Sequence, residues 1–117
     1  FDFTNILLCN IVPIKIYTNI KKDKKDLISD NKNKSGIYKW TNTMNNEFYI
    51  GSSINLSKRL NQYLNKEFLL KNGNSKIYKA LLKYEYKNFK LEILEYCDKD
   101  LLISREQYFF NKKDKIY

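Results

Sequence analysis

Five side chains in this sequence have types and spacing that could support chemistry. Tyr38 and Tyr49 stand in two short segments separated by ten residues, and each segment also carries a glycine and an isoleucine. Arg59 and Tyr63 are four residues apart, so they share one face if that segment is helical. Glu106 stands in an apolar pattern of helical spacing, where a carboxylate is costly unless it is paired or binds a metal. Together these groups could bind a phosphate, a metal ion and a water molecule.

The composition narrows the possible chemistry further. The sequence contains no histidine, which excludes histidine acid–base catalysis and the Ser-His and Cys-His nucleophile pairs. Cys9 and Cys97 form no C-x-x-C pair, so neither a structural zinc site nor a disulfide framework is expected. Catalysis would have to rest on tyrosine, lysine, arginine, carboxylates and metal-bound water. Only Arg59 and Arg105 among the 22 basic residues are arginine, which suggests that each makes a contact that lysine cannot make.

The net charge of +9 favours a polyanionic partner, because each phosphate that a lysine or arginine neutralises releases a condensed counterion. Nucleic acid is the first candidate and an acidic membrane surface the second. The longest apolar stretch, residues 6–16, is interrupted by Asn10, Pro13 and Lys15 and is too short to cross a membrane. It also lacks the features of a secretory signal. We therefore expect no membrane partner.

The elements that must position these residues can be read from local patterns. Residues 36–40 and 47–51 read as two strands, and the asparagines between them predict the turn of a hairpin. A helix is expected after residue 55, where Leu56, Leu60, Tyr63 and Leu64 have helical spacing. A second helix is expected from residue 74 or 75 to about 84, a strand over 88–96, and a last helix from residue 98 or 100.

The predicted fold is α/β (α+β): a small, mainly antiparallel sheet of about three strands flanked by helices in the order ββααβα. With 117 residues there is room for one modest core. We expect a division into residues 1–34, an N-terminal arm and charged linker, and residues 35–117, a folded domain. Residues 20–34 read as a linker or a short helix.

The motif Gly36-Ile37-Tyr38, ten residues, then Tyr49-Ile50-Gly51 resembles the pair of tripeptides that gives the GIY-YIG nuclease family its name. The likeness continues to Arg59 and to the segment around Glu106, and it covers roughly residues 35–117. It is strongest to intron-encoded homing endonucleases of fungal mitochondria, and the Lys, Asn, Ile and Tyr-rich composition fits an AT-rich genome of that kind. The resemblance implies a metal-dependent DNA endonuclease module located in the mitochondrial matrix.

The resemblance also implies roles for the five residues. Tyr38 would act as general base or position the nucleophile, Tyr49 and Tyr63 would belong to the same hydrogen-bonded network, and Arg59 would fork onto the scissile phosphate. Glu106 would hold Mg²⁺, or another divalent cation, at the leaving oxygen. A base role for Tyr38 needs a strongly lowered pKa, because an ordinary tyrosine titrates near about 10. The lysines expected to flank the cleft and contact phosphates are Lys58, Lys76, Lys79 and Lys83.

Several features keep other readings open. Asn74 stands where some family members have a histidine, the late asparagine of the family has no counterpart up to Tyr117, and the usual DNA-recognition region does not follow. A retired nuclease domain, kept as a nucleic-acid-binding or structural component of a mitochondrial ribonucleoprotein such as the ribosome, is therefore the alternative, with structured RNA as a possible partner. A plain basic interaction domain, in which Tyr38 and Tyr49 only pack across strands, is a third reading.

Overall fold

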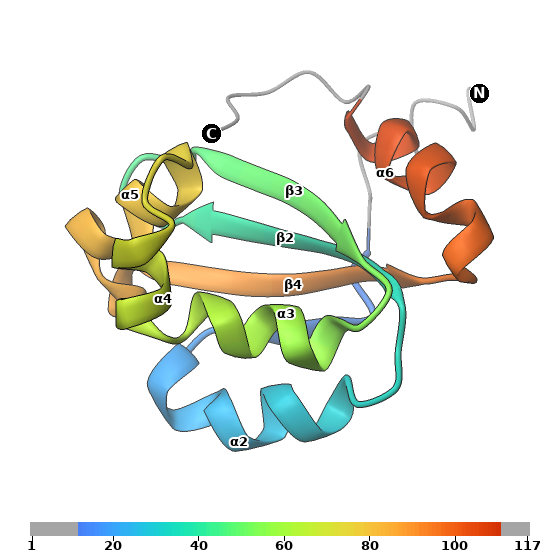
Figure 1. Ribbon diagram of the computed structural model, residues 1–117, viewed down its shortest axis with the longest axis horizontal. Helices are drawn as coiled ribbons and strands as arrows, with labels where there is room; N and C mark the ends of the chain where they lie inside the picture. The colour runs from blue at the N-terminus through green and yellow to red at the C-terminus, as the bar shows by residue number, and fades with distance from the viewer. Residues whose placement is uncertain (1–11, 111–117) are drawn as a thin grey trace.

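A four-stranded antiparallel sheet forms the centre of the protein, and the computed structural model describes residues 12–110 (Figure 1). In spatial order the strands are β1 (Lys15–Tyr17), β4 (Phe89–Tyr96), β2 (Gly36–Asn42) and β3 (Phe48–Ser53). The sequence predicted about three strands; the fourth is β1, which pairs with β4 at one edge of the sheet. Residues 1–11 of the expected arm and 111–117 of the expected domain lie outside the described residues.

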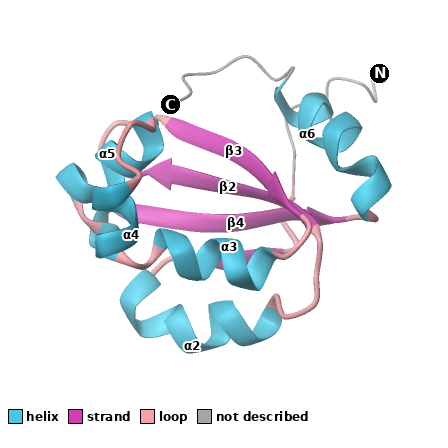
Figure 2. Cartoon of the chain, in the orientation of Figure 1, coloured by secondary structure: helices cyan, strands magenta, loops and turns pink. Residues whose placement is uncertain are grey.

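Helices flank the sheet in nearly the predicted order (Figure 2). They are α2 (Ile20–Asp30), α3 (Leu56–Tyr63), α4 (Lys66–Lys71), α5 (Lys76–Tyr84) and α6 (Leu102–Phe110), with 3₁₀ turns η1 (Tyr86–Asn88) and η2 (Lys99–Leu101). The short α4 was not predicted. Within residues 12–110, no helix is both long and apolar enough to span a membrane.

The β2–β3 hairpin forms because its turn residues suit a reversal of the chain. Asn46 adopts a left-handed backbone with φ of 62°, which asparagine tolerates better than most residues. The side-chain oxygen of Asn42 accepts from the Met44 amide at 2.9 Å, and that of Asn45 accepts from the Glu47 amide at 2.9 Å. The resulting register sets Tyr38 opposite Gly51 and Trp40 opposite Tyr49.

Each face of the sheet has its own apolar core. On one face, side chains of β2 and β4 such as Trp40 and Leu91 pack against α2, α3 and α5. On the other face, side chains such as Ile37 and Ile50 pack against Leu102 and Phe109 of α6. In Figure 1, α2 and α3 lie side by side, while α6 lies apart from them near the far ends of the strands. The sheet is thus fixed from both sides, which gives the hairpin a rigid position.

The segment expected to be arm and linker contributes to this core. Residues 20–30 form α2, in agreement with the helix alternative, and Leu27 of α2 is fully buried. Asn31 at its end is also fully buried: its amide donates to the Leu27 carbonyl at 2.7 Å, and its oxygen accepts from the Tyr96 hydroxyl at 2.8 Å. The Tyr17 hydroxyl donates to Asp30 at 2.9 Å. This network joins β1 and α2 to β4, so residues 15–31 pack as part of the same core.

Candidate active site

The hairpin and α3 bring four of the five predicted site residues into one cluster. Helix α3 starts where the Asn55 side chain accepts a hydrogen bond from the Lys58 amide at 3.1 Å, which caps the N-terminus of the helix. From that start, Arg59 and Tyr63 face the sheet one turn apart. Tyr38 and Tyr49, on neighbouring strands, have ring centroids 6.3 Å apart on this same face.

Tyr38 and Tyr63 form the buried floor of the cluster. Their hydroxyl oxygens are 2.8 Å apart in a hydrogen bond, and their rings meet edge to face with centroids 5.6 Å apart. Their side chains are essentially inaccessible, with exposures of 1% and 0%. Neither phenol is open to a bulky substrate, and what lies between this floor and the solvent is the set of groups above it.

Arg59 lies over this floor and is held on several sides. Its Nη2 donates to the Tyr63 hydroxyl at 3.3 Å and its Nη1 donates to the Gln62 side-chain oxygen at 3.1 Å. The guanidinium carbon lies 4.4 Å from the centroid of the Tyr63 ring and 5.5 Å from that of Tyr78. Such contacts are specific to arginine, because its planar group both stacks and forks.

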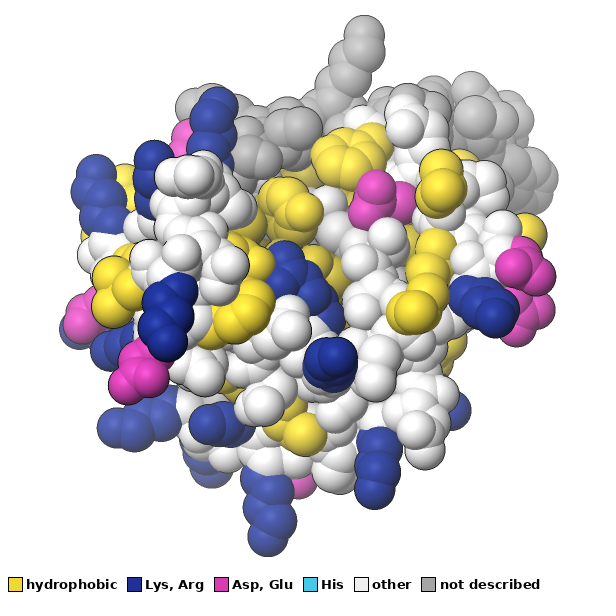
Figure 3. All heavy atoms as spheres, viewed as in Figure 1, with side chains coloured by type: hydrophobic (Ala, Val, Ile, Leu, Met, Phe, Trp, Pro, Cys, Tyr) yellow, Lys and Arg dark blue, Asp and Glu magenta, His cyan; other side chains and the backbone are white. Residues whose placement is uncertain are grey.

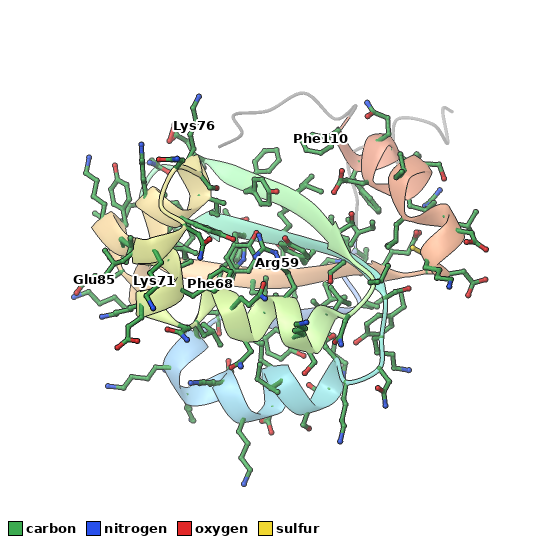
Figure 4. The ribbon with its side chains drawn as sticks, in the orientation of Figure 1. Arg59, Phe68, Lys71, Lys76, Glu85 and Phe110 are labelled. Atoms are coloured by element: carbon green, nitrogen blue, oxygen red, sulfur yellow. The ribbon has the colours of Figure 1, made fainter. Side chains whose placement is uncertain are left out.

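Two of these contacts were missed by sequence reasoning. Gln62 follows Arg59 by three residues, a helical spacing that could have identified it. Tyr78 comes from α5 and no local pattern pointed to it. Figure 4 shows Arg59 near the middle of the molecule, above α3, and Figure 3 shows basic side-chain atoms in a hollow at that place, beside hydrophobic side chains.

Gly51 makes the close packing of the two motif tyrosines possible. A Cβ atom at this position would lie 2.5 Å from the Tyr38 hydroxyl oxygen and 2.8 Å from Cε2 of Tyr49. Both distances are far shorter than ordinary contacts between nonbonded atoms. Gly51 has no positive φ, so its backbone conformation does not require a glycine. The Tyr38 and Tyr49 side chains that pack over it are what leave no room for a Cβ atom.

Glu106 approaches the cluster from α6. It is half-buried, and its negative charge is among the causes that raise the pKa of Tyr49. No group of three or more Asp, Glu or Cys residues within residues 12–110 could form a metal cage. Mg²⁺ at phosphate-processing sites is commonly held by one or two carboxylates, with waters and substrate oxygens completing its shell. A single half-exposed carboxylate beside the cluster fits that requirement.

The buried phenols titrate far above neutral pH. Burial raises the pKa of Tyr38 to about 12, although the hydrogen bond with Tyr63 works in the opposite direction. Burial, followed by the charge of Tyr38, also raises the pKa of Tyr63. Burial raises the pKa of Tyr49 as well. A base role for Tyr38 needed a lowered pKa, so these shifts favour the other alternative, in which Tyr38 positions the reacting groups as a neutral phenol.

The lysines expected at the cleft are exposed but scattered. Lys58 lies on the outer side of α3, and Lys76, Lys79 and Lys83 lie on α5. Figure 4 shows Lys76 pointing outward, away from Arg59. The Lys83 ammonium lies 5.1 Å from the centroid of the Tyr84 ring. None of these four is among the side chains that contact Arg59, so phosphate contacts by them remain predictions.

Known proteins share this arrangement of sequence and fold. Residues 34–117 match the model of the GIY-YIG catalytic domain. A protein of Neurospora crassa described as "Probable intron-encoded endonuclease 1" is 36% identical over 91 residues, which cover 74% of this chain and 29% of that protein. This chain thus spans less than a third of that relative.

Two solved structures of the catalytic domain of intron endonuclease I-TevI also resemble the chain. One, of a mutant, is 34% identical with a TM-score of 0.56 and is covered to 82% of its length by 68% of this chain. The other is 31% identical with a TM-score of 0.53, is covered to 87% of its length, and again matches 68% of this chain. The match to the catalytic-domain model over residues 34–117, together with these two structures, therefore identifies the chain as a member of the GIY-YIG family.

Proposed function

We propose that this domain is a metal-dependent DNA endonuclease module of homing type, which hydrolyses one phosphodiester bond at a time. The observation that carries the proposal is the clamped arginine: Arg59 is held by Gln62, Tyr63 and Tyr78 in an orientation that requires no further ordering when substrate binds. A preorganised charge of this kind stabilises a transition state more than it stabilises the ground state, because no reorganisation is needed as negative charge develops.

The exposure of each side chain decides whether it would contact the substrate or support a group that does. Arg59 is half-buried and presents its guanidinium to the scissile phosphate, where two N–H donors can fork onto two oxygens. Tyr49 is half-buried, and its pKa is raised by the charge of Glu106 and lowered by that of Arg59. A neutral Tyr49 phenol can hydrogen-bond the attacking water. The Tyr63 hydroxyl, itself hydrogen-bonded to Tyr38, accepts from Arg59 and so fixes the orientation of the guanidinium.

Glu106 would hold Mg²⁺, which supplies positive charge at the leaving oxygen. Burial is the largest cause that raises the pKa of the Tyr49 phenol, so Tyr49 stays a hydrogen-bond donor at neutral pH. The negative charge of Glu106 acts in the same direction only while no cation is bound to it.

The relatives support cleavage of DNA by this domain over binding of nucleic acid without cleavage. The matched Neurospora protein and the matched structures are described as endonucleases, which favours DNA as the substrate over an RNA or ribonucleoprotein partner. Mitochondrial localisation is part of the proposal and is supported by the fungal intron-encoded relative and by the composition of the chain.

The test is nicking of supercoiled plasmid DNA by the purified chain, with and without a series of divalent cations. We expect nicking that depends on the metal and falls at least about 10²-fold in Arg59→Ala and in Glu106→Ala, the loss typical of removing one transition-state donor. Arg59→Lys should fall by a similar factor, since it keeps the charge but loses the fork and the stacking.

Glu67→Ala is the matched control, because Glu67 is an exposed carboxylate on α4. It should nick like the wild type. Thermal unfolding checks that every variant is folded. The proposal fails if the folded wild type cuts no plasmid with any divalent cation, or if Arg59→Ala cuts as fast as Glu67→Ala.

A further inference from the structure

Helix α2 carries its charges on two separate flanks. Successive residues of an α-helix are about 100° apart around its axis, so the position of every side chain on the helix surface follows from its number. The buried residues Ile20 and Leu27 mark the side that faces the core. To one side of this buried stripe lie Lys21, Lys24 and Lys25, and to the other side lie Asp23, Asp26 and Asp30. Lys22 lies at the back of the helix, next to Asp26.

This separation differs from the surface of an ordinary solvated helix. Charges of opposite sign four residues apart support a helix, whereas like charges at spacings of three or four oppose it. Lys21 has like-charged neighbours at both spacings, in Lys24 and Lys25. Within residues 12–110, none of the four lysines of α2 forms an ion pair with a carboxylate. The lysine flank is therefore a concentrated positive charge that the described part of the protein does not neutralise.

The same flank lines two adjoining hollows in the surface. One, of about 520 Å³, lies between the start of α2, the end of α3 and η1, and is lined by Lys21, Lys24, Leu64, Lys66, Tyr86 and Lys87 among others. The other, of about 550 Å³, lies along α2 itself and is lined by Lys21, Lys22, Lys24, Lys25, Ile28 and Ser29. Lys21 and Lys24 line both hollows, which are here together called the α2 groove.

The α2 groove contains six lysines and a single carboxylate, Glu85, whose side chain also lines it. Glu85 lies 3.6 Å from Lys87, and both side chains are largely exposed, so this pair neutralises little. Figure 3 shows the lysine and arginine side chains that project along the lower edge of the molecule, where α2 runs in Figure 1. A row of lysines along a groove is complementary to the evenly spaced charges of a nucleic-acid backbone.

Helix α3 connects the α2 groove to the candidate active site. Arg59 lies in the middle of α3, and Leu64, which caps its end, lines the groove. At 1.5 Å of rise per residue the two are only about 8 Å apart along the helix axis. The Tyr86 hydroxyl, at the groove wall, donates to the Tyr63 carbonyl at 2.6 Å, which ties the wall to the end of α3. Duplex DNA carries phosphates all along its axis, so a duplex that is held at Arg59 and runs past the end of α3 would present further phosphates to the groove.

We propose that the α2 groove is a second phosphate-binding site, which holds the DNA backbone beside the scissile bond. The ligand identity rests on the proposed function, in that DNA is taken as the nucleic acid. Lysines on a helix flank contact phosphates without reading bases, so the groove adds affinity and not sequence preference. The groove is built partly from residues 19–29, which precede the segment matched by the GIY-YIG model.

The test compares two double variants of equal charge. Lys21→Gln/Lys24→Gln removes the two lysines shared by both hollows, and glutamine keeps a good helix propensity. Lys32→Gln/Lys99→Gln removes two exposed lysines outside the groove. The dissociation constant of each protein is measured on two unrelated duplexes over a range of salt concentrations without divalent metal. Thermal unfolding verifies that both variants fold.

We expect the groove variant to lower the slope of log K against log salt by about 1.8, which corresponds to two lost phosphate contacts, equally on both duplexes. The control variant should leave the slope close to that of the wild type.

Equal slopes for the two double variants would overturn the groove as a DNA site. A groove variant that binds DNA normally but loses binding to phosphatidylserine vesicles would overturn it in favour of a membrane surface. Because binding is read without cleavage, a wild type that binds DNA with the expected slope but never cuts would refute the endonuclease proposal and leave the groove standing.

Discussion

Replacing Gly51 by alanine tests whether the tight packing of the tyrosines sets the geometry of the site. The new Cβ would lie 2.5 Å from the Tyr38 hydroxyl oxygen and 2.8 Å from Cε2 of Tyr49. To reach an ordinary contact of about 3.4 Å, the Tyr38 hydroxyl would have to retreat by about 0.9 Å. Tyr38 is buried and hydrogen-bonded to Tyr63, so it has little room to do so. The displacement must pass to Tyr63 and then to Arg59.

Two effects of Gly51→Ala can be measured separately. Inserting a methyl group into a packed interior costs about 1–3 kcal/mol, which lowers the melting temperature by roughly 5–15 °C for a domain of this size. A shift of about 1 Å at a catalytic group costs on the order of 10²-fold in rate. We therefore expect a protein that is folded at 25 °C but nicks supercoiled plasmid about a hundred times more slowly than the wild type.

Gly73→Ala provides the matched control, because the nearest atom to its Cβ is the Leu70 carbonyl oxygen at 3.2 Å, in the turn between α4 and α5. It should change stability by less than about 1 kcal/mol and leave the nicking rate unchanged. A Gly51→Ala protein that melts lower yet nicks at the wild-type rate would refute the reasoning. So would one that melts like the wild type, since the methyl group would then have found space.

Two further predictions concern the buried phenols. Tyr38→Phe and Tyr63→Phe should each lower the free energy of unfolding by about 1–3 kcal/mol, because each change leaves the other buried hydroxyl without this partner. The double variant should lose less than the sum of the two single losses, since it leaves neither hydroxyl behind. Additive losses in urea unfolding would contradict the pairing. Burial raises the pKa of Tyr86 to about 12 from 10.0, so the stability that its neutral phenol contributes is complete below pH 10 and is lost as the pH rises towards 12. Tyr86→Phe should flatten the fall of unfolding free energy over that range, and an unchanged slope would contradict this assignment.

Local patterns in the sequence were enough to predict the hairpin, α3, α5 and β4, because their turns, caps and apolar spacings are encoded by near neighbours. Strand β1 was missed because it has three residues and exists only through pairing with β4, where Ile16 lies opposite Glu92. Helix α2 was left undecided because only Ile20 and Leu27 are fully buried in it, which is too few to establish a period.

In the candidate site, too, some contacts follow from local sequence patterns and others depend on tertiary packing. The contact of Arg59 with Tyr63 follows from helical spacing, and the pairing of Tyr38 with Tyr49 follows from the hairpin. The contact with Tyr78 depends on how α5 packs on α3, and the influence of Glu106 on Tyr49 depends on where α6 docks. Both are set by tertiary packing, which no short stretch of sequence encodes.

The buried Asn31 network has a consequence for any attempt to move this module into another protein. The segment that matches the GIY-YIG model begins at residue 34, three residues after Asn31. A graft cut at that point would leave behind Ile20 and Leu27, which cover the sheet, and would deprive the Tyr96 hydroxyl of its acceptor. The portable unit is therefore longer than the family signature, and a hybrid enzyme should be joined ahead of β1.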